Sequence, residues 1–138
     1  MGYLVLCAYD GSAAADRAFD FAAILALRFQ GSVHTLAVAQ PTDGMSGRDT
    51  KALFEAGMMR FQPKFERLRL KGAGAGVEQK FELCLGYPPH QILHRAGELQ
   101  VDHIVIGHQG KSAMQRWELG SVAQRVVMHA SVLVTVVP

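Results

Sequence analysis

The chain has 138 residues, 49% of them hydrophobic, and a formal net charge of only +2. This size and balance predict one soluble globular domain over residues 1–138, with enough apolar residues to bury a core unaided. The basic residues are scattered, which argues against a nucleic-acid partner, and no segment reaches the roughly 20 apolar residues of a membrane helix. No basic segment precedes the first apolar run, so no signal peptide is expected and the predicted compartment is the cytoplasm.

The first predicted element is a strand at residues 3–9, a short and continuous apolar run. A run of this length, closed by turn residues, is typical of a strand buried on both faces. A helix over residues 13–29 follows, and either Ser12 or Asp10 can cap its first turn. Residues 32–39 form a second apolar run, which predicts a second buried strand.

The middle of the chain begins with a predicted loop at residues 41–48, which contain proline and glycine. Residues 49–71 predict a long helix, and Pro63 within it should kink the helix or split it in two. The glycine-rich residues 72–76 predict a turn. Residues 77–85 then alternate between apolar and charged side chains, which is typical of a half-exposed edge strand.

The last third predicts a helix at residues 88–99 with proline in its first turn, a strand at 102–107, a helix at 121–129 and a strand at 131–137. Strands that alternate with helices in this way indicate βαβ units. We therefore predict an α/β fold in which five parallel strands, in the order 3-2-1-4-5, form a doubly wound, Rossmann-like sheet with helices on both faces. Ligands of such sheets bind beyond the carboxyl ends of the strands.

A glycine motif lies at this edge of the predicted sheet, between the strand at 102–107 and the helix at 121–129. Its pattern is G-x2-G-x9-G-S, formed by Gly107, Gly110, Gly120 and Ser121. About 0.01 matches are expected by chance in a chain of this composition. Glycines let the backbone approach an anion closely, and a Gly-Ser pair before a helix leaves amide groups free to bind one. The motif therefore predicts a phosphate-binding loop.

Together these patterns resemble the universal stress protein family, in particular its ATP-binding subgroup, over essentially the whole chain. Four blocks carry the resemblance: VLCAYDGS at 5–12, Gly86-Tyr87-Pro88 with Ile92, DHIVIGHQGKS at 102–112 and LGSVAQRVV at 119–127. The first block alone is weak, and the last two are specific to the family. Some members lack the glycine spacing and do not bind ATP, whereas this chain keeps every element of it.

The resemblance implies a regulatory stress-response protein that binds ATP, or AMP or ADP, with Mg²⁺ accompanying the nucleotide. It places Asp10 at the adenosine end of the ligand and makes Ser121 a phosphate contact. The other implied site residues act through apolar contact or backbone amides: Ala8, Val38, Ile106, Gly107, Gly110, Gly120 and Val122. It also implies a homodimer that pairs the segment from Val132 to Val136 of two copies. That apolar strand would otherwise leave an exposed edge.

Several residues leave alternatives open. His90 and His94 lie four apart on one helix, but no H-E-x-x-H pattern surrounds them, which favours surface histidines over a metal pair. His108 and Lys111 can contact phosphate or face solvent. Cys7 and Cys84 lie in apolar runs, which favours small buried hydrophobic roles. The pattern offers no nucleophile with a base beside it, so any ATP hydrolysis or autophosphorylation is expected to be slow. A slow ATPase or autophosphorylating protein, and a nucleotide-free interaction dimer, remain as alternatives to a regulatory ATP-binding dimer.

Overall fold

A computed structural model of the chain describes residues 2–41, 47–109 and 119–138. Its single sheet orders the strands β3-β2-β1-β4-β5, and every neighbouring pair is parallel. These strands are β1 (Leu4–Ala8), β2 (Ser32–Ala39), β3 (Glu78–Leu85), β4 (His103–Gly107) and β5 (Leu133–Val137). The helices between them are α1 (Ala13–Arg28), α2 (Gly47–Ala75), α3 (Pro88–Leu99) and α4 (Ser121–His129). The predicted fold class and strand order are confirmed.

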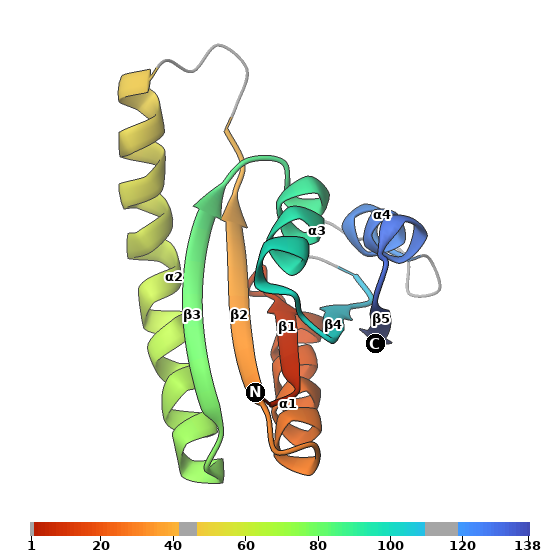
Figure 1. The fold of residues 1–138 in the computed structure, drawn as a ribbon. Helices are drawn as coiled ribbons and strands as arrows, with labels where there is room; N and C mark the ends of the chain where they lie inside the picture. Colours follow the sequence, from red (N-terminus) through yellow and green to blue (C-terminus); the bar gives the residue numbers. More distant parts are fainter. Residues whose placement is uncertain (1, 42–46, 110–118) are drawn as a thin grey trace.

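The sheet separates two hydrophobic cores (Figure 1). Because neighbouring side chains of a strand point to opposite faces, Val5 and Cys7 of β1 pack against α1 and α2, whereas Leu6 and Ala8 pack against α3 and α4. This explains why the first strand is apolar without interruption. Cys7 is fully buried, and burial raises the pKa of its thiol above the ordinary range, as expected of an inert core cysteine.

The helix α2 differs from its prediction in two ways. It runs without a break through Pro63, so the predicted split is wrong. Phe61 and Phe65 on either side of the proline are both buried against the sheet, and this packing holds the helix together although Pro63 donates no backbone hydrogen bond. The helix also includes Gly72 and ends at Ala75, so the predicted turn is shorter than expected. The turn consists of Gly76, whose φ of +81° suits glycine.

The strand β3 is an edge strand, as predicted. Val77 and Leu83 are buried on the face that α2 covers. On the other face, Oε1 of Glu82 lies 2.7 Å from Nε2 of His34 and accepts a 2.9 Å hydrogen bond from Nη2 of Arg95. Partial burial favours a higher pKa for Glu82, but hydrogen bonds from these two partners outweigh it and hold this pKa below its usual range. The carboxylate therefore links β2, β3 and α3.

A row of hydrogen-bonded polar side chains connects β1, β4 and β5 near the amino ends of β1 and β4. Nδ1 of His103 lies 3.0 Å from the hydroxyl of Tyr3, and its Nε2 lies 2.6 Å from the hydroxyl of Thr135. The imidazole is buried, and burial lowers its pKa. The three side chains thus join β4 to β5 and to the residue that precedes β1.

This imidazole predicts a pH dependence of stability. The unfolded chain binds a proton at His103 near a pH of about 6.5, whereas the folded chain resists that proton. The contribution of the neutral His103 to the free energy of unfolding is therefore fully present above this pH and is lost as the pH falls below it. We expect the melting temperature, followed by circular dichroism, to drop between about pH 7 and pH 5 and to drop less steeply in His103→Gln. An unchanged slope in His103→Gln, relative to the parent and to a His129→Gln control, would contradict this assignment.

Candidate functional site

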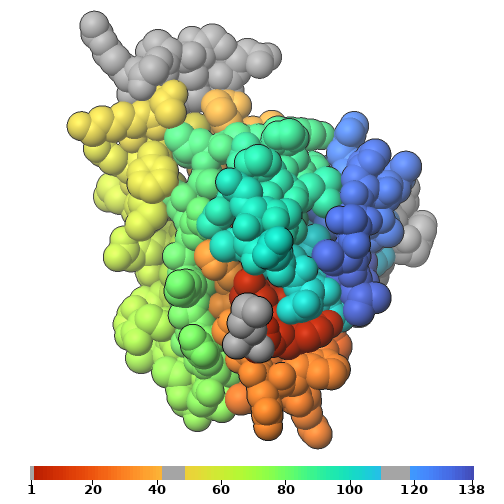
Figure 2. Space-filling model, in the orientation of Figure 1, coloured from red at the N-terminus to blue at the C-terminus, as the bar shows by residue number. Residues whose placement is uncertain are grey.

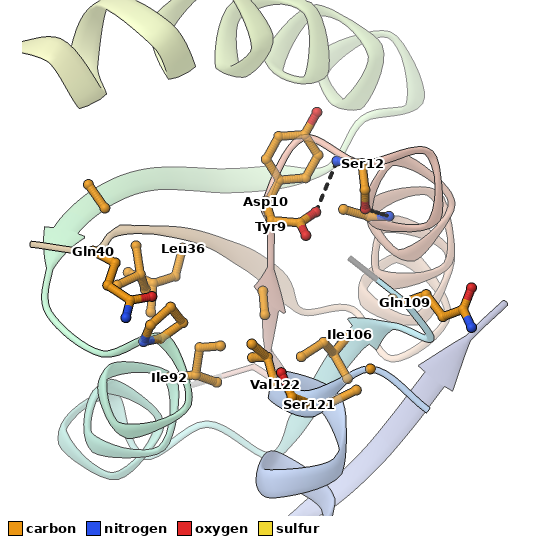
Figure 3. Close-up of a pocket in the computed structure, with 18 of the residues that line it drawn as sticks. Tyr9, Asp10, Ser12, Leu36, Gln40, Ile92, Ile106, Gln109, Ser121 and Val122 are labelled. Atoms are coloured by element: carbon orange, nitrogen blue, oxygen red, sulfur yellow. Dashed lines mark hydrogen bonds between the residues drawn. The ribbon is translucent and has the colours of Figure 1, made fainter. Parts of the chain in front are cut away.

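A cleft of about 1030 Å³ opens at the carboxyl ends of the strands (Figure 3). Its floor comes from the ends of β1, β2 and β4, and its walls come from α2, the start of α3 and the start of α4. Figure 3 shows Ile92 of α3, Ile106 of β4 and Val122 of α4 directed into the same space. In a doubly wound sheet this edge, where chain connections leave in opposite directions, is the usual place for a ligand.

The segment after β1 is held in a fixed turn. Oδ1 of Asp10 accepts a 2.9 Å hydrogen bond from the backbone N–H of Ser12. The hydroxyl of Ser12 in turn accepts a 3.1 Å hydrogen bond from the N–H of Ala15 and caps α1. Of the two predicted capping residues, Ser12 therefore caps the helix and Asp10 braces the turn. The carboxylate of Asp10 is exposed at the cleft, and its second oxygen makes no hydrogen bond to the described residues.

Tyr9, which precedes this turn, fastens the cleft to α1 and α2. Its hydroxyl donates a 2.7 Å hydrogen bond to Oδ1 of Asp16 and accepts a 3.2 Å bond from Arg67. Burial, followed by the bond to Asp16, raises the pKa of Tyr9 above its ordinary value. Partial burial favours a higher pKa for Asp16 as well, but hydrogen bonds from Tyr9 and Arg67 outweigh it and lower this pKa. Both groups thus serve as structural contacts among the end of β1, α1 and α2.

The end of β4 approaches α1 more closely than a side chain allows. A Cβ at Gly107 would lie 3.0 Å from the carbonyl carbon and from the Cβ of Ala14. Just beyond it, the backbone N–H of His108 donates to the carbonyl of Val137 at 2.6 Å. The backbone carbonyl of His108 accepts a 2.9 Å hydrogen bond from the N–H of Gly120. The bond between His108 and Gly120 brings the two ends of the motif together, because Gly107 directly precedes His108.

The start of α4 faces this cleft without a side-chain cap. Gly120 is the N-cap residue, and it has no side chain that could accept a hydrogen bond from the first-turn amides. Ser121, Val122 and Ala123, which carry those amides, all line the cleft. The N–H groups of a first helical turn have no partner within the helix, and the helix dipole gives this end a positive potential. The arrangement suits an anion at this wall of the cleft.

The structure brings together every predicted site residue that it describes. The cleft is lined by Ala8, Asp10, Val38, Ile106, Gly107, Gly120, Ser121 and Val122. The remaining one, Gly110, lies outside the described residues, as does Lys111. His108 also lines the cleft and is half-buried. His90 and His94 lie instead on the exposed side of α3.

The sequence interpretation missed one whole wall of the cleft, which α2 supplies. Its lining residues are Leu53, Ala56, Gly57, Arg60 and Phe61, a spacing of three and four that places them on one helix face. A Cβ at Gly57 would lie 2.8 Å from Leu83, so this glycine lets α2 lie close to β3. The signal in the sequence was Arg60, a charged residue at one position of an otherwise apolar stripe. In the structure its guanidinium lies 4.9 Å from the ring centre of Phe61.

Comparison with known proteins gives consistent matches. The model of the universal stress protein family matches residues 4–138. A universal stress protein of Methanocaldococcus jannaschii is 30% identical over 135 residues, which cover 93% of this chain and 77% of that protein. Among solved structures, the universal stress protein UspA from Lactobacillus plantarum has a TM-score of 0.88 at 27% identity, and the match covers 99% of this chain and 97% of that one.

Two further solved structures, both 22% identical to this chain, share the fold and were determined with nucleotides. One is a universal stress protein in complex with cAMP, with a TM-score of 0.76 over 99% of this chain and 97% of that one. The other is a universal stress protein from Archaeoglobus fulgidus in complex with dAMP, with a TM-score of 0.74 over 100% of this chain and 98% of that one.

Proposed function

This chain belongs to the universal stress protein family, and from that premise we propose that it is a homodimeric regulatory protein that holds ATP in the cleft at the carboxyl edge of its sheet. The observation that carries this proposal is the uncapped start of α4. Gly120 leaves the first-turn amides without a side-chain acceptor, and the same turn lines a cleft that contains the other predicted site residues that the structure describes. A phosphate group supplies the acceptor oxygens and the negative charge that such a helix end favours.

The phosphates therefore bind between Gly107 and the first turn of α4, where backbone amides and the hydroxyl of Ser121 donate to their oxygens. The sequence motif predicts the same role for Gly110, which lies outside the described residues. Among the described residues no group of three or more His, Cys, Asp or Glu side chains could hold a metal. We expect Mg²⁺ to arrive with the phosphates, because Mg²⁺ keeps several waters and takes few protein ligands in nucleotide sites.

The adenosine half of the ligand binds over the ends of β1 and β2. Ala8, Val38 and Ile106 give this part of the cleft an apolar surface, and the free oxygen of Asp10 can accept a hydrogen bond from the ribose or the base. A cleft of about 1030 Å³ lies just above the range of roughly 300–1,000 Å³ for small-molecule sites, so it has room for a whole nucleotide. The cAMP and dAMP complexes of related proteins support the choice of an adenine nucleotide.

We further propose that the nucleotide is held rather than turned over. In the described lining of the cleft, Asp10 is the only carboxylate, and one of its oxygens already braces the turn before α1. Neither serine hydroxyl of that lining, of Ser12 or of Ser121, makes a hydrogen bond to a histidine or carboxylate side chain of the described residues, as an activated nucleophile does.

The dimer forms through β5 and its preceding residue, the segment from Val132 to Val136. β5 is the last strand of the sheet, and its outer edge meets no other strand among the described residues. Leu133 on this strand is 65% exposed, and Val127 and Met128 on α4 are exposed as well. α4 and β5 lie together at one margin of the molecule (Figure 2). An antiparallel pairing of two copies would cover this apolar edge.

Calorimetric titration with ATP and Mg²⁺ tests the nucleotide half of the proposal. We expect saturable heat with one nucleotide bound per chain, weaker binding of AMP, which offers fewer phosphate oxygens, and no ATP turnover in a phosphate-release assay. The absence of heat at millimolar ATP from a dimeric protein would favour the nucleotide-free interaction dimer instead. Steady phosphate release that is absent in a Gly120→Val variant would contradict the proposal that the nucleotide is not hydrolysed and would identify the protein as a slow ATPase.

A further inference from the structure

Two histidines lie side by side on the solvent face of α3, away from the cleft. His90 and His94 are one helical turn apart, their ring centres are 6.1 Å from each other, and the ring planes differ by only 4°. Both side chains are exposed. The opposite side of the same helix is buried at Ile92 and Ala96. α3 lies on the face of the molecule that Figure 2 turns to the viewer.

A carboxylate stands one turn further along the same face. Oε1 of Glu98 lies 3.3 Å from Nε2 of His94 and 3.2 Å from Nη1 of Arg95. A negative charge beside Nε2 favours the tautomer in which this nitrogen carries the proton, and the lone pair of the ring is then on Nδ1. Histidines that bind metals usually have their second ring nitrogen directed at a carboxylate in this manner.

From this arrangement we propose that His90 and His94 together bind one divalent transition-metal ion of the Ni²⁺, Cu²⁺ or Zn²⁺ type. Imidazole nitrogen is a preferred ligand of these ions. Two histidines four residues apart project from one side of a helix, the spacing found in helical zinc motifs. Because both side chains are exposed, rotation about their own bonds brings two ring nitrogens to the metal–nitrogen distance of about 2.0–2.1 Å without movement of α3.

The surroundings of the pair set the strength of this site. No group of three or more ligating side chains is found in the part of the chain that the structure describes, so water completes the coordination of the ion. Glu98 shares its charge with Arg95 and acts on the ion through His94 rather than as a ligand. His90 is also in the first turn of α3, where the helix dipole disfavours a cation. The site is therefore a weak and exchangeable one, independent of the nucleotide cleft.

The test is a calorimetric titration of the untagged, nucleotide-free protein with NiCl₂, supported by its retention on an immobilised-Ni²⁺ column. We expect one Ni²⁺ per chain in the parent. His90→Gln and His94→Gln should each weaken binding by roughly tenfold or more, because a single imidazole loses the advantage of two linked ligands. Glu98→Gln should cause a smaller loss. His129→Gln, which removes an exposed histidine at the end of α4, serves as the matched control and should bind as the parent does.

Circular dichroism establishes that each variant is folded, and glutamine suits an exposed helix position. Three results would overturn the proposal: no Ni²⁺ binding by the parent below millimolar metal, parent-like binding by both His90→Gln and His94→Gln, or an equal loss in His129→Gln. The last result would mean that the ion distributes over separate surface imidazoles. None of them bears on ATP binding, since neither histidine lines the cleft.

Discussion

Replacing Gly120 with valine is expected to weaken ATP binding by about thirtyfold, or roughly 2 kcal/mol, as measured by calorimetry. The residue is the N-cap of α4 and lines the cleft directly before Ser121 and Val122, so valine adds bulk beside the amides proposed to bind phosphate. Its φ of −59° and ψ of 152° are open to valine, so the backbone does not have to change. The effect should therefore come from a blocked and partly desolvated anion site rather than from an unfolded helix.

The matched control is Gly97→Val, on α3. A Cβ at this exposed glycine would meet no atom within 4 Å, so the same substitution is made where no cleft exists. We expect parent-like ATP affinity in this control. Valine is a poorer N-cap than glycine, which costs α4 about 1 kcal/mol or less, so the melting temperature of each variant should accompany the titration. Parent-like affinity in a folded Gly120→Val protein would contradict the proposal that the phosphates bind at the start of α4.

The prediction from sequence succeeded where the pattern of neighbouring residues is enough to determine the position of a segment in the fold. An uninterrupted apolar run such as residues 3–9 has few alternatives to a strand buried on both faces, and β1 holds this position at the centre of the sheet. Glycines directly after a strand and directly before a helix are similarly restricted. The structure accordingly places both Gly107 and Gly120 at the cleft, where the N–H of Gly120 bonds to the carbonyl of His108, the residue after Gly107.

The prediction failed where distant parts of the chain decide the outcome. Pro63 predicted a kink or a split in the helix; the split is wrong, because the burial of Phe61 and Phe65 against the sheet keeps α2 continuous. Gly72 was predicted to lie in a turn, yet it is helical, and the side chain of Gln79 packs beside it and donates to the carbonyl of Arg69 at 2.7 Å. No local pattern contains these contacts.

The wall that α2 contributes to the cleft shows the same limit. Its residues are apolar and helically spaced, as on any helix that packs on a sheet, and only the tertiary structure shows that the stripe extends past the sheet edge into the cleft. Arg60 was the exception to that pattern. A charged residue within an apolar stripe is the local sign that part of the stripe faces a solvent-filled space rather than a core.

The proposed dimer through the segment from Val132 to Val136 offers the second large effect. We expect Leu133→Asp to convert the dimer to a monomer at concentrations where the parent is dimeric, as measured by light scattering after size-exclusion chromatography. Leu133 is 65% exposed in the single chain, so aspartate there leaves the fold of the monomer intact. In a two-fold interface each copy brings its own carboxylate to the same seam, so two charges would have to be desolvated together.

A loss of roughly 2 kcal/mol or more of association free energy follows from that desolvation. Leu70→Asp is the matched control, because Leu70 is 60% exposed on α2, beside the opposite edge strand β3. This variant should remain dimeric. If Leu133→Asp stays dimeric and Leu70→Asp does not, the copies pair through the α2 side of the molecule, and the exposed edge of β5 must be protected in another way. If both variants stay dimeric, neither edge forms the interface.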